Sequence, residues 1–227
     1  MPILNMIYWA TWWGGWWWQP WANTIAYYQF DNNLNDSSGN SHNFSMATWT
    51  PTYWTASWGA KYIHFTQWTY TTNITIPYTT SAYTINVRLK YDWTDKCFID
   101  IQPQTNSQWW NRWGYLSSTS LYICSWSGTT VTGLDLTNWI NVVAVLNGST
   151  AETYINGVLK NTTSIVQAQT TANYFRLNTV WYGGSTSVYT SNAWNNYMSE
   201  LILESKSWTA QEISDYYNNT KANYWIS

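Results

Sequence analysis

Short runs of alternating hydrophobic and polar residues follow one another along most of the chain, and clusters of Asn, Asp, Gly and Ser separate them. Alternation with a period of two is typical of β-strands with one buried face, and the intervening residues favour turns. The number and spacing of the runs predict an all-β fold in which two antiparallel sheets pack as a sandwich. Strands are expected at residues 25–30, 61–65, 73–76, 83–91, 97–102, 115–118, 120–124, 139–146, 152–155, 158–162, 175–177 and 197–204.

The clearest turn is expected at Asn156 and Gly157, between hydrophobic pairs at residues 154–155 and 158–159. A two-residue type I′ turn needs positive φ at both central residues, which Asn and Gly tolerate. The pattern therefore predicts a β-hairpin at this point.

One helix is predicted near the end of the chain, beginning after Thr209. The Thr209 side chain can accept a hydrogen bond from the backbone N–H of Glu212, whose carboxylate can reach back to the start of the helix. Ile213, Tyr216 and Tyr217 then share one face. We expect a short helix that packs on the sandwich.

The first residues differ from the rest in composition, because they are rich in tryptophan and glycine and show neither a helical nor a strand period. We interpret residues 1–22 as a tether and residues 23–227 as one sandwich domain. The length agrees with this division, since single sandwich domains run to about 200–250 residues.

Four sequence blocks resemble a known family. They are IAYYQFDNNLNDSSGN at 25–40, KYIHF at 61–65 with ITIP at 74–77, WINVVAV at 139–145 leading into YING at 154–157, and MSELILE at 198–204 followed by TAQEI at 209–213. Over residues 25 to about 220 the chain resembles the laminin-G-like jelly rolls of the concanavalin-A-like lectin and glucanase superfamily. The resemblance implies a two-sheet sandwich closed by a capped helix. That superfamily includes lectins, adhesins, hydrolases and virion proteins, so the fold alone does not give the function.

Tryptophan is unusually abundant, with 21 residues, and many tryptophans occupy turn sites where glycine would be expected. Positive φ costs a bulky side chain much more than it costs glycine. One hypothesis is that most of these codons are UGA, read as glycine in the source organism. The alternatives are exposed platforms that stack on sugar rings, or core and interface aromatics. Trp139 alone fits its strand as a core aromatic.

The recoding hypothesis predicts UGA codons at Trp58, Trp68, Trp93 and Trp126. Sequencing the source gene tests it, and UGG codons at these four positions would exclude it.

No catalytic pattern is evident. The Glu-x-Asp-x-x-Glu strand of the laminarinase-like enzymes in this superfamily is absent. Glu200 and Glu204 share a strand face about 13 Å apart, whereas glycosidase carboxylates lie about 5 to 9.5 Å apart. A pair across strands with Asp100 or Asp135 stays open as an alternative. His64 is expected to face away from its neighbours Ile63 and Phe65, and no Ser/His/Asp or Cys/His spacing occurs.

The first turn offers a dense set of oxygen ligands at Asp31, Asn33, Asn35 and Asp36. Calcium prefers six to eight such oxygens, so Asp31, Asn33 and Asp36 are candidate calcium ligands, and calcium is the one candidate cofactor. The alternative interpretation is a series of Asx-turns, in which these side chains bond their own backbone.

Two cysteines, Cys97 and Cys124, can either form one disulfide or remain as thiols. Only 9% of the residues are charged and the lysines and arginines are scattered, so no nucleic-acid partner is expected. No apolar run reaches the roughly 18 residues of a membrane-spanning helix, and no secretory signal is visible.

These observations favour a non-catalytic recognition module that binds a carbohydrate or a protein partner at a cell or virion surface, as part of a larger assembly. One alternative is a structural domain of a phage tail, capsid or surface assembly without a sugar ligand. A glycoside hydrolase is the third and least favoured interpretation.

Overall fold

The computed structural model describes residues 22–57, 59–66, 69, 71–72, 74–76, 82–91, 96–103, 114–117, 120–123, 129–164, 173–178, 180–181, 188–189 and 196–224. Apart from Ala22, the predicted tether lies outside these residues, and so do Cys124 and the side chain of Cys97. Trp58, Trp68, Trp93 and Trp126 also lie outside them, so the recoding hypothesis stays a prediction.

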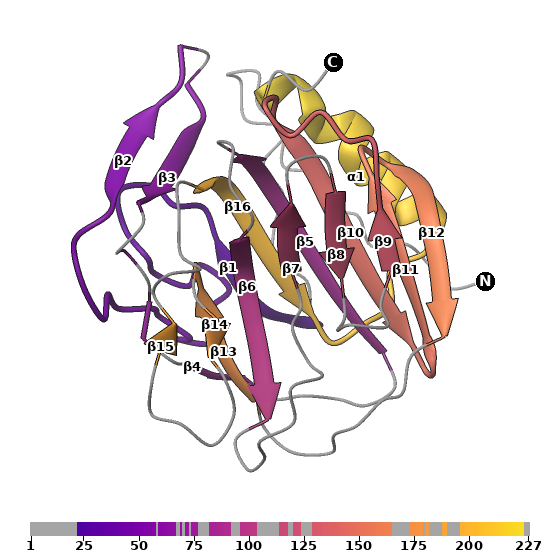
Figure 1. The fold of residues 1–227 in the computed structure, drawn as a ribbon, viewed down its shortest axis with the longest axis horizontal. Helices are drawn as coiled ribbons and strands as arrows, with labels where there is room; N and C mark the ends of the chain where they lie inside the picture. Colours follow the sequence, from indigo (N-terminus) through magenta and orange to yellow (C-terminus); the bar gives the residue numbers. More distant parts are fainter. Residues whose placement is uncertain are drawn as a thin grey trace.

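The larger sheet has eight antiparallel strands in the order β12-β11-β10-β5-β16-β3-β2, and β1 pairs with β16 beside β3 (Figure 1). The bounds are β1 (Thr24–Tyr28), β2 (Thr52–Thr55), β3 (Lys61–Phe65), β5 (Ala82–Tyr91), β10 (Ile140–Asn147), β11 (Thr150–Ile155), β12 (Val158–Ser164) and β16 (Asn196–Glu204).

The smaller sheet has six antiparallel strands in the order β4-β13-β6-β7-β8-β9. Its bounds, with those of a separate strand pair and the helices, are β4 (Ile74–Ile76), β6 (Lys96–Pro103), β7 (Gly114–Ser117), β8 (Ser120–Ile123), β9 (Thr129–Val131), β13 (Asn173–Leu177), β14 (Val180–Trp181), β15 (Val188–Tyr189), α1 (Ala210–Thr220) and the 3-10 helix η2 (Lys221–Tyr224).

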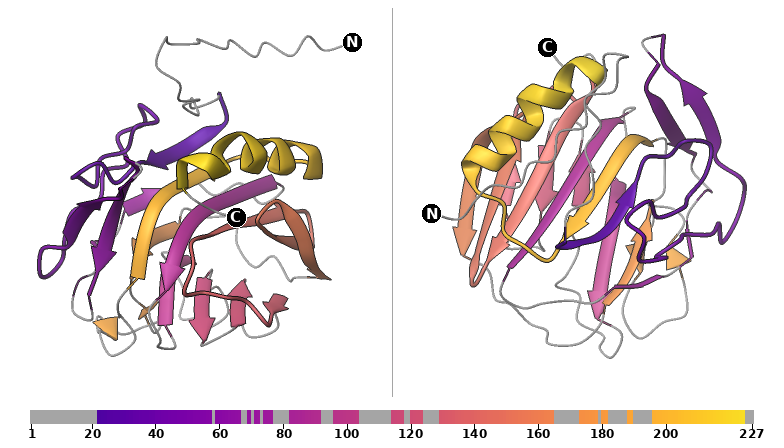
Figure 2. Two further views of the ribbon diagram at one scale, coloured as in Figure 1. Left: turned by 90° about the horizontal axis from the view of Figure 1, so that it is seen from above. Right: turned by 180° about the vertical axis from the view of Figure 1, so that it is seen from behind.

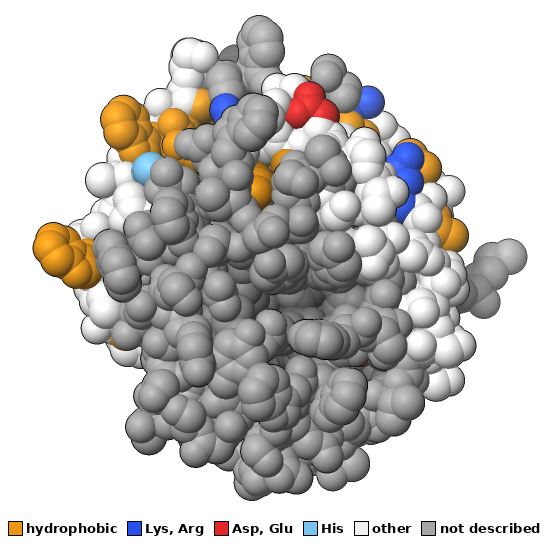
Figure 3. All heavy atoms as spheres, in the orientation of Figure 1, with side chains coloured by type: hydrophobic (Ala, Val, Ile, Leu, Met, Phe, Trp, Pro, Cys, Tyr) orange, Lys and Arg blue, Asp and Glu red, His pale blue; other side chains and the backbone are white. Residues whose placement is uncertain are grey.

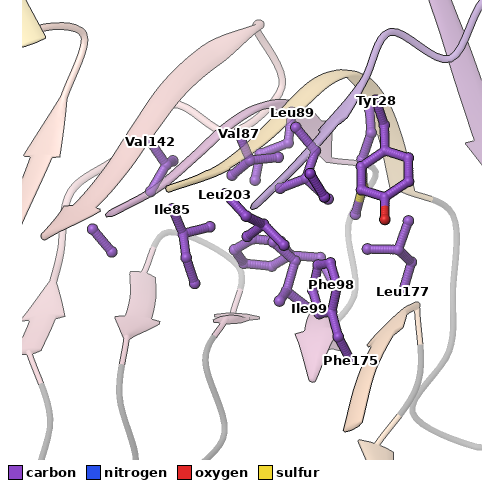
Figure 4. Packing of buried hydrophobic residues seen from close by; sticks show 14 of the residues in the cluster. Tyr28, Ile85, Val87, Leu89, Phe98, Ile99, Val142, Phe175, Leu177 and Leu203 are labelled. Carbon is purple, nitrogen blue, oxygen red and sulfur yellow. The ribbon is translucent and has the colours of Figure 1, made fainter. Parts of the chain in front are cut away.

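The two sheets face each other across one hydrophobic core (Figure 4). Ile85, Val87 and Leu89 alternate along β5 and point into it, and they meet Phe175 and Leu177 of β13 from the opposite sheet. Removing this apolar surface from water is the main stabilising contribution of a sandwich. The predicted all-β, two-sheet antiparallel sandwich with one short C-terminal helix is confirmed.

Helix α1 covers part of the outer face of the eight-stranded sheet (Figure 2). A second hydrophobic cluster joins the helix to this face, so the central strands are buried on both sides. Its members are Tyr27, Val143, Val145, Tyr154, Ile202, Trp208, Ile213 and Tyr216.

A buried ion pair lies under the helix. Arg88 Nε donates to Glu200 Oε2 at 3.0 Å, and both side chains are almost fully buried. The Tyr27 hydroxyl donates to the other carboxylate oxygen at 3.2 Å, and the Tyr216 hydroxyl of α1 also donates to Glu200. Arg88 reaches the Thr220 hydroxyl at the end of α1. A charge in this position is tolerated because each partner is neutralised and hydrogen-bonded.

Glu204 lies at the end of β16, on the same face of the strand as Glu200. Its carboxylate accepts hydrogen bonds from the Thr24 hydroxyl at 2.9 Å and from Trp208 Nε1 at 2.7 Å. Burial raises the pKa of Glu204 above its ordinary value, and the bonds from Trp208 and Thr24 oppose that shift. Glu204 therefore links β1, through Thr24, and the segment before α1, through Trp208, to β16.

The hairpin between β11 and β12 turns at Asn156 and Gly157, which have φ of 51° and 77°. A Cβ atom at position 157 would lie 3.1 Å from the Tyr217 side chain, so the turn also needs the small residue for the close approach of α1. The helix begins with a complete capping box: the Thr209 hydroxyl accepts from Glu212 N, and Glu212 accepts from Thr209 N.

The expectation for Trp139 was wrong. It precedes β10, which begins at Ile140, and it is half-buried and not in the core. Among the tryptophans whose burial the structure describes, Trp208, which connects β16 to α1, is buried, at 2% exposure. Ile140 occupies the inward position in that register, so the ring of Trp139 is directed to the outer face.

Four strands were not predicted: β2, β9, β14 and β15. Strand β2 is largely exposed, and β9 has only three residues, so neither carries a buried alternating pattern. The pair β14 and β15 is two residues long on each side.

Replacing Glu200 with Leu should lower the free energy of unfolding by about 3–5 kcal/mol, because Arg88 is left as an unpaired buried charge. Urea denaturation measures this loss. The double variant with Arg88→Met and Glu200→Leu should lose less than the sum of the two single variants. Strictly additive losses would contradict the pairing.

Replacing Thr209 with Ala should lower the free energy of unfolding by about 1 kcal/mol, because one backbone N–H at the start of α1 loses its acceptor. The matched control is Thr209→Ser, which keeps the hydroxyl and should stay close to the wild-type value. Equal stability of the Ala and Ser variants would show that the cap contributes nothing.

Candidate functional site

Helix α1 covers only part of the outer face of the eight-stranded sheet. The candidate site lies on the rest of that face, towards the edge formed by β3 and β2. In β3, Ile63 and Phe65 are fully buried in the core, so Tyr62 and His64 between them point to the outer face. His64 therefore has the orientation that alternation predicts.

Strand register extends this set of outward side chains across neighbouring strands. Directly opposite residues of antiparallel strands share a face. Trp54 of β2 pairs with Tyr62, and Thr52 pairs with His64. On the other side of β3, His64 pairs with Tyr197 of β16.

The aromatic side chains of this region contact one another. The Tyr62 ring meets the Trp139 ring edge-on at 5.5 Å and the Tyr197 ring at 6.0 Å. The rings of His64 and Tyr197 are stacked, 4.3 Å apart with an interplanar angle of 9°. We call these five residues, including Trp54, the outer aromatic face.

The outer aromatic face is accessible to a ligand. Trp54 is 54% exposed, and Tyr62, His64, Trp139 and Tyr197 are half-buried. Figure 3 views the molecule from the side opposite α1, and at its upper left, where Figure 1 draws β2 and β3, hydrophobic side chains and a histidine reach the edge of this view. Rings fixed by mutual contact and exposed on one side offer flat apolar surface at little entropic cost.

Polar groups lie beside the rings. Trp54 Nε1 donates to the Thr52 hydroxyl at 3.2 Å, and that hydroxyl lies 3.4 Å from His64 Nδ1. Lys90 of β5 pairs with Tyr197, so its side chain joins the same face. The site therefore combines stacking surface with hydrogen-bonding groups and a cation.

The candidate catalytic carboxylates do not converge on this face. Glu200 and Glu204 are committed to the contacts beneath α1. Asp100 lies in the other sheet, where it pairs with Arg176 at 3.7 Å and is almost fully buried. Asp135 is exposed and bonds within its own loop, where hydrogen bonds from Thr137 and Asn138 lower its pKa.

The Asp36 carboxylate is occupied by donors from its own loop and from β1. Oδ1 accepts from the backbone N–H of Tyr27 at 2.9 Å and of Ser38 at 2.8 Å. Oδ2 accepts from the Ser38 hydroxyl at 2.8 Å and from the backbone N–H of His42 at 3.0 Å. Because these donors use the lone pairs that a cation would need, Asp36 is placed to order the loop.

The other candidate calcium ligands are directed elsewhere. Asp31 forms an ion pair with Lys61 at 3.1 Å. Asn33 Oδ1 accepts from the backbone N–H of Asn35 at 2.8 Å, which is an Asx-turn. Within the described part of the chain, no group of three or more His, Cys, Asp or Glu residues could hold a metal ion.

Sequence reasoning missed Tyr62, Tyr197, Trp54 and Lys90 as site residues. The alternation in KYIHF was sufficient to direct Tyr62 outward with His64. The pairing of β16 with β3 on one side and with β5 on the other, however, joins segments far apart in the chain.

No helix in the part of the chain that the structure describes is long and apolar enough to cross a membrane.

No protein-family model and no curated protein matches the sequence. Several solved structures share its fold. Domain 4 of AbnA, a GH43 extracellular arabinanase from Geobacillus stearothermophilus solved with arabinotriose, superposes with a TM-score of 0.61 at 17% identity, over 85% of this chain and 97% of that domain.

Toxin binding domains also superpose. The binding domain of botulinum neurotoxin serotype D/C gives a TM-score of 0.60 at 14% identity, and that of Paraclostridial Mosquitocidal Protein 1 gives 0.58 at 13%. Each match covers 86% of this chain but 52% of the toxin domain, so the chain spans about half of their length. These likenesses show the fold, a β-sandwich; the laminin-G-like assignment stays a prediction.

Proposed function

We propose that this chain is a non-catalytic carbohydrate-recognition module that binds its ligand on the outer aromatic face. The observation that carries the proposal is the group of contacting rings at Tyr62, His64, Trp139 and Tyr197, flanked by the exposed Trp54. These rings come from segments far apart in the sequence and meet on one side of a rigid sheet.

Sugar rings have apolar C–H faces and polar hydroxyl edges, and the site has groups suited to both. An aromatic ring presents a flat surface to the C–H face, while neighbouring polar groups can bond the hydroxyls. The Thr52 hydroxyl, His64 and Lys90 supply such groups around the rings. Because each ring is held by another ring or by its strand, little conformational entropy is lost when a ligand binds.

The structural neighbours support this choice of ligand class. The arabinanase domain was solved in complex with arabinotriose, and the binding domain of botulinum neurotoxin DC was solved in complex with SialylT. Another toxin of the same group enters cells through interaction with two ganglioside molecules. A carbohydrate ligand is therefore preferred to the protein partner that the sequence left open.

The absence of catalysis is proposed because the carboxylates have other roles. Glu200 neutralises Arg88 under the helix, and Glu204 holds Trp208 and Thr24. A hydrolase needs an acid and a second carboxylate on opposite sides of a bound glycosidic bond. Among the described residues, the groups at the outer aromatic face are instead aromatic rings, the Thr52 hydroxyl and the Lys90 ammonium group.

A recognition module of this kind would act at a cell or virion surface, where several copies on one assembly bind together. Shallow aromatic sites bind single sugars weakly, and multivalent display raises the overall affinity without new contacts. The assignment of residues 1–22 as a tether agrees with such display.

Replacing Tyr62 or Trp139 with Ala should weaken glycan binding about tenfold, because each ring supplies stacking surface that Ala lacks. A glycan array with the wild-type chain identifies the best ligand, and isothermal titration calorimetry measures the variants against it. The matched control is Leu159→Ala, since Leu159 is an exposed hydrophobic residue on β12 at the opposite edge of the sheet. This control should bind as the wild type does.

Two results would contradict the proposal. One is a wild-type chain that binds no glycan on the array. The other is unchanged glycan binding by both Tyr62→Ala and Trp139→Ala in folded protein.

A further inference from the structure

Among the described residues, Lys90 is the cation that lies at the outer aromatic face. It is half-buried, and its register partner is Tyr197, whose own partner on the next strand is His64. Across four neighbouring strands, Lys90, Tyr197, His64 and Thr52 thus form one row of outward side chains.

Trp139 lies at the Lys90 end of this row. Ile140 pairs with Leu89 in antiparallel register, so the preceding residue, Trp139, is placed next to Lys90 on the outer face. The cation therefore has a tryptophan on one side and a tyrosine on the other. A ligand that stacks on these rings would bring its substituents within reach of the Lys90 ammonium group.

Among the described residues, the cation that precedes Lys90 on this face of β5 is already paired, whereas Lys90 is not. Arg88, two residues earlier, is bound to Glu200. Among the described residues, the Lys90 ammonium group forms neither a hydrogen bond nor an ion pair. A half-buried cation without a counter-charge favours an anion, since the partial loss of water strengthens the attraction.

We infer that the outer aromatic face recognises sugars that carry an acidic substituent, and that Lys90 is the residue that binds this substituent. The inference rests on the proposed carbohydrate function and adds the ligand class. A lysine ammonium group is a point charge without the planar fork of arginine, so it suits a carboxylate or a sulfate equally. The chemistry that is recognised is the negative charge placed beside a stacked sugar ring.

The test compares ligands that share one core and differ in charge. Lactose, sialyllactose and sulfated lactose form one series, and an oligogalacturonide with its methyl-esterified form gives a second. Isothermal titration calorimetry with the full chain should show at least about tenfold tighter binding of the acidic members at low salt, the range expected for a charge-assisted hydrogen bond. That advantage should shrink as the salt concentration rises.

Replacing Lys90 with Gln should abolish the preference for acidic ligands, so that the ratio of acidic to neutral affinity falls to about one, whatever contact with sugar hydroxyls is lost for both members of a pair. The matched control is Lys160→Gln, because Lys160 is an exposed lysine on β12 at the far edge of the sheet. This control should retain the full preference for acidic ligands.

The outcomes separate the two proposals. Equal binding of acidic and neutral members by the wild type, or an acidic preference that survives in Lys90→Gln, would overturn this inference and leave the carbohydrate function standing. A chain that binds no member of either series would overturn this inference, and the glycan array with the wild-type chain would decide the carbohydrate function separately. A sialylated ligand bound without its sulfated analogue would assign the site to carboxylates, and the reverse would assign it to sulfates; either supports the inference.

Discussion

The burial of β5, β10 and β16 on both faces is the constraint on which the rest of the structure depends. The inner face of these strands packs on the six-stranded sheet, and the outer face packs beneath α1. A strand that is buried on one side needs only alternating hydrophobic residues. These strands carry polar residues on the helix side, and each of them needs a partner within the layer.

The Arg88–Glu200 pair satisfies that need at the centre of the layer. Tyr27 from β1 and Tyr216 from α1 both donate to Glu200, so one carboxylate joins the first strand, the last strand and the helix. Buried pairs of this kind add little net stability compared with apolar residues, but they are costly to break and they fix register. We therefore regard Glu200 as the residue that positions α1 and not as a catalytic group.

The position of α1 also determines where a ligand can bind. The helix covers β10, β11 and the adjacent part of β16, and it ends near Arg88. The next outward residue of β5 is Lys90, and from there to β2 the sheet carries half-buried and exposed aromatic side chains in place of a helix. The proposed binding site is thus the part of the sheet that the helix leaves uncovered (Figure 2).

The sequence by itself determined the class of fold, most strands, the Asn156-Gly157 turn and the capping box at Thr209. These features are local: alternation, turn chemistry and a four-residue cap can each be recognised within a few neighbouring positions. It also directed His64 away from Ile63 and Phe65. Only the tertiary structure decided that Tyr62 and Tyr197 meet, that Trp139 faces outward and that Trp208 is buried. Those facts depend on which distant strands pair and on where the helix packs. Neither can be read from the spacing of residues along the chain, because the strand register and the contacts between layers join residues more than a hundred positions apart.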